Sequence, residues 1–117
     1  SAESPRLFEM RRYTTRGGML PALDARFRDH TMALFQKHGM TNLLYFHLDA
    51  GQEGAENTLL YFLAHASDEA RKSSFKTFGE DPEWKSVRDA SEKDGKLLID
   101  KGVVSTSLRP TDFSPLR

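Results

Sequence analysis

The chain has 117 residues, of which 17 are basic and 17 are acidic, and it contains no cysteine. This length predicts one domain, the balanced charge argues against nucleic-acid binding, and the lack of thiols excludes disulfides, zinc–thiolate sites and thiol catalysis. No apolar run approaches the roughly 20 residues of a membrane-spanning helix. We therefore expect a soluble, cytoplasmic protein with a single domain at residues 6–115, preceded by a flexible segment at residues 1–5.

The first third of the chain predicts a strand followed by a helix. Residues 6–13 alternate, with Phe8 and Met10 on one face and a mixture of charged and aromatic side chains on the other. Apolar side chains then recur at steps of three and four over residues 19–38, which is typical of a helix with one buried side. Pro21 suits its first turn, and Gly39 suits the left-handed position that ends a helix.

The centre of the chain predicts a β-hairpin that is apolar on both faces. Residues 40–49 and 57–65 are rich in β-branched, aromatic and leucine side chains, and the link between them contains two glycines. Two helices are predicted next, one beginning after Ser67 and a shorter one beginning at the sequence Asp81-Pro82-Glu83. Residues 97–107 predict the last strand.

This order of elements predicts an α+β fold, a ferredoxin-like βαββαβ sandwich with an extra short helix. Both main helices would cover one face of an antiparallel sheet and leave the other face open. A large exposed apolar patch usually marks an interface, so we expect two subunits to pack their sheets together as a homodimeric α/β barrel. The side chains expected on the open face are Leu43, Tyr45, Leu59, Tyr61 and Leu63.

The polar face of the first strand is the main candidate site. Glu9, Arg11 and Tyr13 share this face, and buried charges must be paired. One interpretation is a salt bridge that fixes the sheet or the dimer. The other is a ligand pocket in which Arg11 holds an anionic or carbonyl group.

Further polar side chains would complete such a pocket. Tyr45, His47 and Tyr61 would adjoin Arg11, and His47 and Tyr61 would be the candidates for catalytic proton transfer. Trp84 is the only tryptophan. It is expected either to anchor the extra helix or to line the mouth of the cavity, where Arg88 could stack or pair.

The four histidines do not predict a metal site. His30 and His38 are eight residues apart on one helix, and His47 and His65 are offset along paired strands by well over about 10 Å. No two of them can therefore share an ion within one subunit. A single haem ligand needs no second histidine, so His30 or His65 could serve as one. No other cofactor is expected.

Several stretches together resemble the NIPSNAP family, in its small bacterial form. They are FEMRRY at residues 8–13, KHG at 37–39, DPEW at 81–84 followed by Arg88, and a carboxyl-terminal pattern of Leu108, PTD at 110–112 and SP at 114–115. The resemblance implies a dimeric α/β barrel and little about activity.

Two kinds of function are left open by the sequence. The first is a dimeric module that binds a small hydrophobic or aromatic molecule or another partner, without catalysis. The second is a small monooxygenase or isomerase, cofactor-independent or haem-type, acting on a hydrophobic aromatic substrate in the barrel cavity. The second rests on families that share the barrel, and a fold alone does not fix a function.

Overall fold

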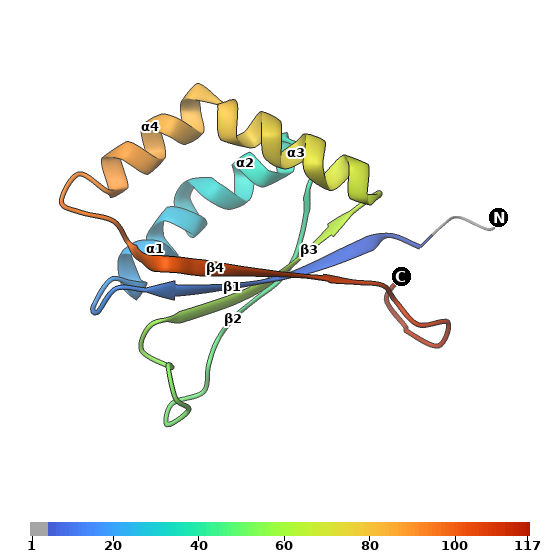
Figure 1. Cartoon of the computed structure of the whole chain (residues 1–117), viewed down its shortest axis with the longest axis horizontal. Coiled ribbons are helices and arrows are strands. Elements are labelled where there is room, and N and C mark those ends of the chain that lie inside the picture. Colours follow the sequence, from blue (N-terminus) through green and yellow to red (C-terminus); the bar gives the residue numbers. More distant parts are fainter. Residues whose placement is uncertain (1–4) are drawn as a thin grey trace.

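The computed structural model describes residues 5–117 and shows four helices on one face of a four-stranded antiparallel sheet (Figure 1). The strands are β1 (Leu7–Thr15), β2 (Thr41–His47), β3 (Thr58–His65) and β4 (Leu98–Leu108), in the order β2-β3-β1-β4. The helices are α1 (Leu20–Arg26), α2 (Met32–Lys37), α3 (Asp68–Glu80) and α4 (Pro82–Ser91). The predicted ferredoxin-like fold is confirmed. Apart from Pro5, the predicted flexible segment lies outside the described residues.

The first helix contains a widened turn that the spacing of its apolar residues does not predict. Between α1 and α2, the segment η1 (Phe27–Thr31) is a π-helix, in which the N–H of Met32 bonds to the carbonyl of Phe27. Arg26 and Phe27 meet at the start of this turn, three and four residues after the buried Leu23, and both lie in the interior, with exposed fractions of 7% and 4%. Such turns are frequently found at functional sites.

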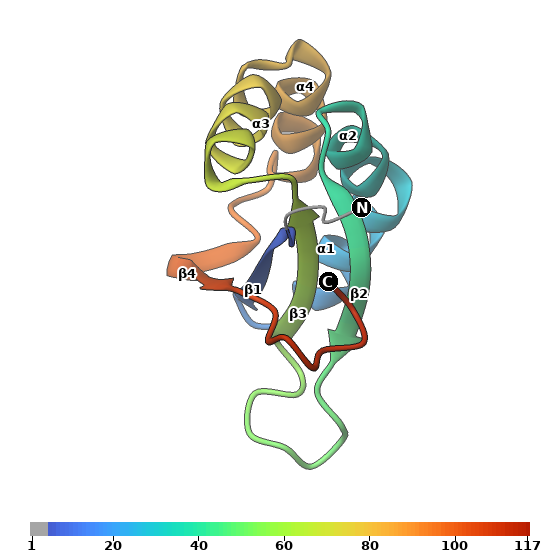
Figure 2. The same ribbon diagram turned by 90° about the vertical axis from the view of Figure 1, so that its right-hand side faces the viewer.

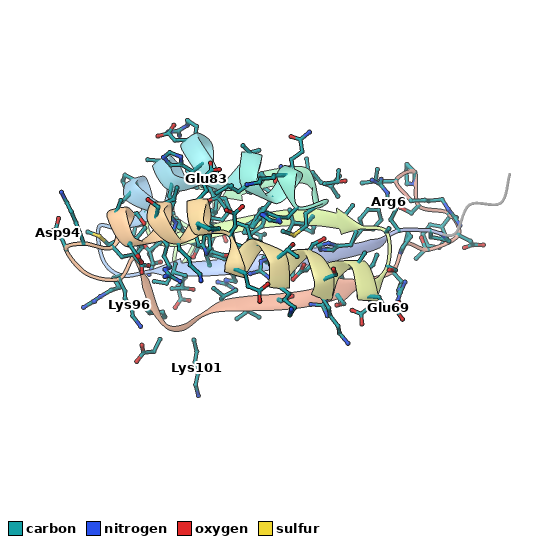
Figure 3. The ribbon with its side chains drawn as sticks, turned by 90° about the horizontal axis from the view of Figure 1, so that it is seen from above. Arg6, Glu69, Glu83, Asp94, Lys96 and Lys101 are labelled. Carbon is teal, nitrogen blue, oxygen red and sulfur yellow. The ribbon has the colours of Figure 1, made fainter. Side chains whose placement is uncertain are left out.

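The second pair of helices begins at the predicted capping residues. The Ser67 side chain accepts a hydrogen bond from the N–H of Ala70 at 3.0 Å, and the Asp81 side chain accepts one from the N–H of Glu83 at 2.8 Å. Trp84 on α4 packs against Phe78 on α3, with ring centroids 4.6 Å apart. Figure 3 looks down on this layer, where charged side chains such as Glu69 and Asp94 lie at the outer surface.

The helix-covered face of the sheet carries the main core. Tyr13, Leu59, Tyr61 and Leu63 pack in one cluster with helix residues that include Phe27 and Phe35. Strand pairing places Glu9 opposite Leu63 and Arg11 opposite Tyr61, so Glu9, Arg11 and Tyr13 face the helices as well.

The expectation that Tyr45, Leu59, Tyr61 and Leu63 line the open face is therefore wrong. Each central strand is apolar on both sides, so alternation separates the two faces but does not show which of them the helices cover. Leu43 lies at an irregularity in the pairing of β2 with β3, and it faces a groove on the open side.

The open face carries the alternate residues of the same strands. Leu44, Phe46 and Val104 are 50%, 46% and 56% exposed there. The pairings of Met10 with Phe62 and of Arg12 with Leu60 continue this face across the two central strands. The carboxyl-terminal segment borders one end of it (Figure 2). Leu116 and Pro110 of this segment line a groove there with Phe8.

Candidate functional site

A cavity of about 260 Å³ lies between the helix-covered face of the sheet and the helices. Its walls come from β1, β4, all four helices and the π-turn, and six of the thirteen lining residues are aromatic. The ring-bearing residues are Tyr13, Phe27, Phe35, Phe75, Phe78 and Trp84, and the charged ones are Arg11, Arg26, Arg88 and Glu92. Four of the predicted ligand-binding residues, Arg11, Tyr13, Trp84 and Arg88, thus meet at one cavity.

A hydrogen-bonded group that includes Arg11 forms one wall of the cavity. Arg11 donates to the Glu9 carboxylate at 2.8 Å, to the hydroxyl of Tyr61 at 2.8 Å and to that of Tyr13 at 3.3 Å. Tyr61 also donates to Tyr13 at 3.0 Å, and the Arg11 guanidinium lies 4.5 Å from the centre of the Phe75 ring. The salt bridge that the sequence suggested between Glu9 and Arg11 is therefore present, and it stands beside a cavity.

Glu9 is a fully buried carboxylate with three side-chain donors. Besides Arg11, it accepts hydrogen bonds from Ser105 and from Nε2 of His65, the latter at 2.9 Å. Burial alone would raise the pKa of Glu9, but these hydrogen bonds more than offset it and lower the pKa to about 2. The same group holds the pKa of Arg11 above its usual value despite burial. At neutral pH, Glu9 and Arg11 are therefore both ionised, and their opposite charges cancel.

Two tyrosines close to this group are neutral at pH 7: Tyr61, which is buried within it, and Tyr45, which is partly buried beside Tyr61. The rings of Tyr45 and Tyr61 stack with their centroids 4.9 Å apart. Burial raises the pKa of both hydroxyl groups. They can donate hydrogen bonds at neutral pH, but they are poor proton acceptors.

Arg26 is a functional candidate that the sequence analysis missed. Its guanidinium lies 5.1 Å from the centre of the Trp84 ring, and its Nη1 atom is 3.2 Å from Ser91 Oγ and 3.5 Å from Glu92 Oε2. Its Nε atom is buried without a hydrogen-bond partner among the described residues. Its position three residues after the buried Leu23 is the helical spacing that could have placed it on the inner side beside Phe27.

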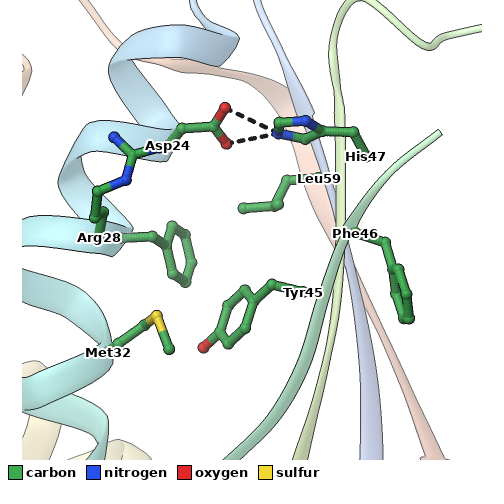
Figure 4. A pocket seen from close by; sticks show the side chains of 8 residues that line it. Asp24, Arg28, Met32, Tyr45, Phe46, His47 and Leu59 are labelled. Atoms are coloured by element: carbon green, nitrogen blue, oxygen red, sulfur yellow. Dashed lines mark hydrogen bonds and ion pairs between the residues drawn. The ribbon is translucent and has the colours of Figure 1, made fainter. Parts of the chain in front are cut away.

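A second cavity of about 290 Å³ opens on the other side of Phe27 (Figure 4). His47 lies at its edge, and its Nε2 atom is 2.8 Å from an oxygen of Asp24. Tyr45 and Phe27 also line this cavity. The structure thus separates His47 from Arg11 and Tyr61, which the sequence had grouped in one pocket.

Neither histidine suggested as a haem ligand fits that role. His65 is 2% exposed, and its Nε2 atom bonds to Glu9. His30 is exposed in a groove between the first helix and α4, away from both aromatic cavities. Within residues 5–117, no three His, Asp or Glu side chains gather around a point where a metal ion could bind, and no helix is long and apolar enough to cross a membrane.

Solved structures share this fold over nearly the whole chain. A NIPSNAP family protein from Agrobacterium tumefaciens is 24% identical, with a TM-score of 0.81 over 100% of this chain and 96% of that one. An uncharacterised NIPSNAP-like domain protein from Burkholderia xenovorans is 21% identical, with a TM-score of 0.78 over 94% of this chain and 89% of that one.

A more distant structural neighbour is an enzyme. A monooxygenase from Streptomyces coelicolor, solved with nanaomycin D, is 12% identical and has a TM-score of 0.58, covering 92% of this chain and 88% of that one. At such identities these likenesses concern the fold. No match was found among curated proteins. The model of the NIPSNAP family matches residues 8–115, and the chain therefore belongs to this family.

Proposed function

We propose that this protein binds a small, mainly aromatic molecule in the cavity between the sheet and the helices. The observation that carries the proposal is the convergence of six aromatic side chains and two largely buried arginines, Arg11 and Arg26, on one cavity. Apolar cavities with a few fixed polar groups are the usual form of a small-molecule site. A core built only for stability would fill this volume with side chains.

Different residues of the cavity would contact different parts of the ligand. The rings of Phe75, Phe78 and Trp84 offer apolar surface and edge-to-face contacts to an aromatic ligand. Arg11 is held in place by Glu9 and the tyrosines, and these contacts occupy three of its five N–H donors. The others are available to a carbonyl oxygen of the ligand without rearrangement, which lowers the entropic cost of binding.

Binding is better supported than catalysis. A monooxygenase or isomerase would use the same cavity and would need a group that takes a proton from the substrate. Glu9 is committed to three donors, burial raises the pKa of Tyr61, and His47 lies at the other cavity. The similarity to the Streptomyces monooxygenase concerns the fold, so it identifies no catalytic residue that would support the enzymatic alternative.

A blocked cavity tests the proposal. Val103 lines the cavity from β4, whereas its neighbour Val104 lies on the open face, so Val103→Trp and Val104→Trp add the same bulk on opposite sides. We expect the neutral probe 1-naphthamide to bind the wild type with one site per chain in isothermal titration calorimetry. Val103→Trp should abolish this binding and Val104→Trp should keep it. Binding that survives Val103→Trp would refute the proposal.

We also propose that the open face joins two copies of this chain. It exposes Leu44 and Phe46 on β2 and Val104 on β4, the two edge strands of the sheet, and only its end is bordered by the carboxyl-terminal segment. A second copy offers the same apolar surface, so a two-fold arrangement would cover both faces at once. The barrel expected from the sequence would form in this way.

Light scattering after size-exclusion chromatography tests the dimer. The wild type should elute with twice the 13.3 kDa mass of one chain. Phe46→Arg should give folded monomers, because it places a charge in the proposed interface. Phe113→Arg is the matched control, since Phe113 is 83% exposed in the carboxyl-terminal segment. A wild-type monomer at micromolar concentration would contradict the proposal.

A further inference from the structure

We infer that Arg26 is the specificity-determining residue of the cavity and that the ligand carries a carboxylate, bound side-on by Nε and Nη2 of Arg26. This inference deepens the proposed function and rests on it, because it names the chemical class of the molecule in the same cavity. It starts from a buried donor whose partner is missing.

The free edge of Arg26 is defined atom by atom. Nη1 has contacts within the chain, to Ser91 Oγ at 3.2 Å and to Glu92 Oε2 at 3.5 Å. Nε is buried and has no hydrogen-bond partner, and Nη2 makes no hydrogen bond with any residue in the range 5–117. The Nε–H and one Nη2–H bond of a guanidinium point in the same direction. This pair forms the fork to which a carboxylate binds with two parallel hydrogen bonds.

In the same cavity, the Nε–Nη2 edge of Arg11 has hydrogen-bond partners within the chain. Its Nε bonds to Tyr61 and its Nη2 to Tyr13, while its Nη1 bonds to Glu9. Every nitrogen of Arg11 thus has a partner from the chain. Arg26 is buried to a similar extent, but its Nε and Nη2 atoms have no hydrogen-bond partner among the described residues. Of the two buried arginines, only Arg26 therefore has an unpartnered fork.

The free-energy cost of leaving the buried N–H of Arg26 without a hydrogen bond argues for a partner from outside the chain. A buried donor without a partner destabilises the folded state, and it does so more strongly when the group is charged. Proteins rarely keep such a group unless something else satisfies it. The guanidinium carbon lies over the Trp84 ring, 5.1 Å from its centre, and Nη1 bonds to Ser91, so these contacts restrict the orientation of the fork.

The charged residues that line the cavity are paired least closely at Arg26. Glu9 lies 2.8 Å from Arg11 and Asp89 lies 3.1 Å from Arg88, whereas Glu92 lies 3.5 Å from Arg26. The formal charges therefore balance, and the unpartnered edge of Arg26 is the feature that favours a carboxylate. An aromatic carboxylate would fit both the rings and the fork.

A matched pair of probes tests the inference with wild-type protein. 1-Naphthoate and 1-naphthamide share the ring system and the planar head group, and they differ in charge and in the second oxygen. Charged bidentate contacts are strong, so we expect the wild type to bind 1-naphthoate about tenfold more tightly than 1-naphthamide in isothermal titration calorimetry. Equal affinities would overturn the inference and would mean that water satisfies the Arg26 fork.

Variants assign the preference to Arg26. Arg26→Gln should lower the affinity for 1-naphthoate about tenfold more than it lowers the affinity for 1-naphthamide. Arg26→Lys keeps the charge without the fork and should lose most of the preference as well. Arg28→Gln is the control, because Arg28 is on the same helical run and lines the other cavity. A preference that persists in a folded Arg26→Lys variant would overturn the assignment.

The same titrations separate this inference from the proposed function. If 1-naphthamide binds and Val103→Trp blocks it, but 1-naphthoate binds no better, the cavity is a binding site and the carboxylate assignment fails. If neither probe binds at a site that Val103→Trp blocks, the proposed function fails together with the inference. The wild-type comparison needs no variant, so it decides the question even if Arg26→Gln does not fold.

Discussion

The two faces of the same four-stranded sheet differ in their side chains and in what covers them. The helix-covered face buries a carboxylate, a guanidinium and two phenols in one hydrogen-bonded group beside a cavity. The open face carries mainly apolar side chains, of which Leu44, Phe46 and Val104 are about half exposed. Buried polar groups need fixed partners, which the helix-covered face supplies, whereas an apolar surface needs only another apolar surface. The face with the polar residues is therefore the inside of the monomer.

The largest difference between the faces should appear on removal of Glu9. In Glu9→Ala, Arg11 and His65 lose the carboxylate that pairs them, so we expect the free energy of unfolding at pH 7 to fall by about 4 kcal/mol. Arg12→Ala changes the neighbouring residue, which is exposed and points to the open face. It should change the free energy of unfolding by less than about 0.5 kcal/mol. Urea unfolding at a fixed protein concentration measures both, and similar losses would contradict the contrast between the faces.

The pH dependence of stability should report the same buried carboxylate. The pKa of Glu9 falls from 4.5 to about 2 on folding, so the unfolded chain binds the proton more tightly between these values. The contribution of Glu9 is complete above pH 4.5 and is lost as the pH falls towards 2; it amounts to about 3 kcal/mol. Glu9→Gln should remove this part of the acid sensitivity. The free energy of unfolding is measured with urea at several pH values between 5 and 2.5. If it falls equally with pH in the wild type and in Glu9→Gln, Glu9 does not titrate in this way.

The smallest expected effect comes from the edge strand. Ser105 on β4 donates to the Glu9 carboxylate, whereas Ser107, two residues further on, makes no side-chain hydrogen bond with any described residue. Ser105→Ala should lower the free energy of unfolding by about 1 kcal/mol and Ser107→Ala by clearly less, because only the first removes a bond to a charged group. Thermal unfolding of the pair at pH 7 is the measurement. A larger loss in Ser107→Ala would mean that β4 contributes to the group in some other way.

The order of the elements could be predicted from the sequence because each signal was local. Ser67 and Asp81 cap their helices as expected, and Gly39 has the left-handed backbone expected of it, with φ +86°. The pairing of Glu9 with Arg11 could also be predicted, since both charges lie on one face of a strand. These conclusions need only the neighbours along the chain.

The placement of the site could not be predicted, because it depends on packing between elements. The strands of the hairpin are apolar on both sides, so the sequence pattern did not show that Tyr61 and Leu63 face the helices. Arg26 continues the inner side of the helix from Leu23 to Phe27, but a pattern of apolar residues alone omits a buried arginine. His47 and Asp24 are 23 residues apart and meet only through the docking of α1 against β2. Each of these features arises from tertiary contacts.

The central claim, that a small molecule binds inside the helix-covered layer, is tested most directly by the indole N–H resonance of Trp84. This is the only tryptophan, so a ¹H–¹⁵N NMR spectrum contains one such signal, and Trp84 lines the proposed cavity. On titration with 1-naphthamide, we expect this signal to shift and saturate, while the amide signals of Phe46 and Val104 on the open face stay in place. An unmoved indole signal, or shifts confined to the open face, would contradict the account.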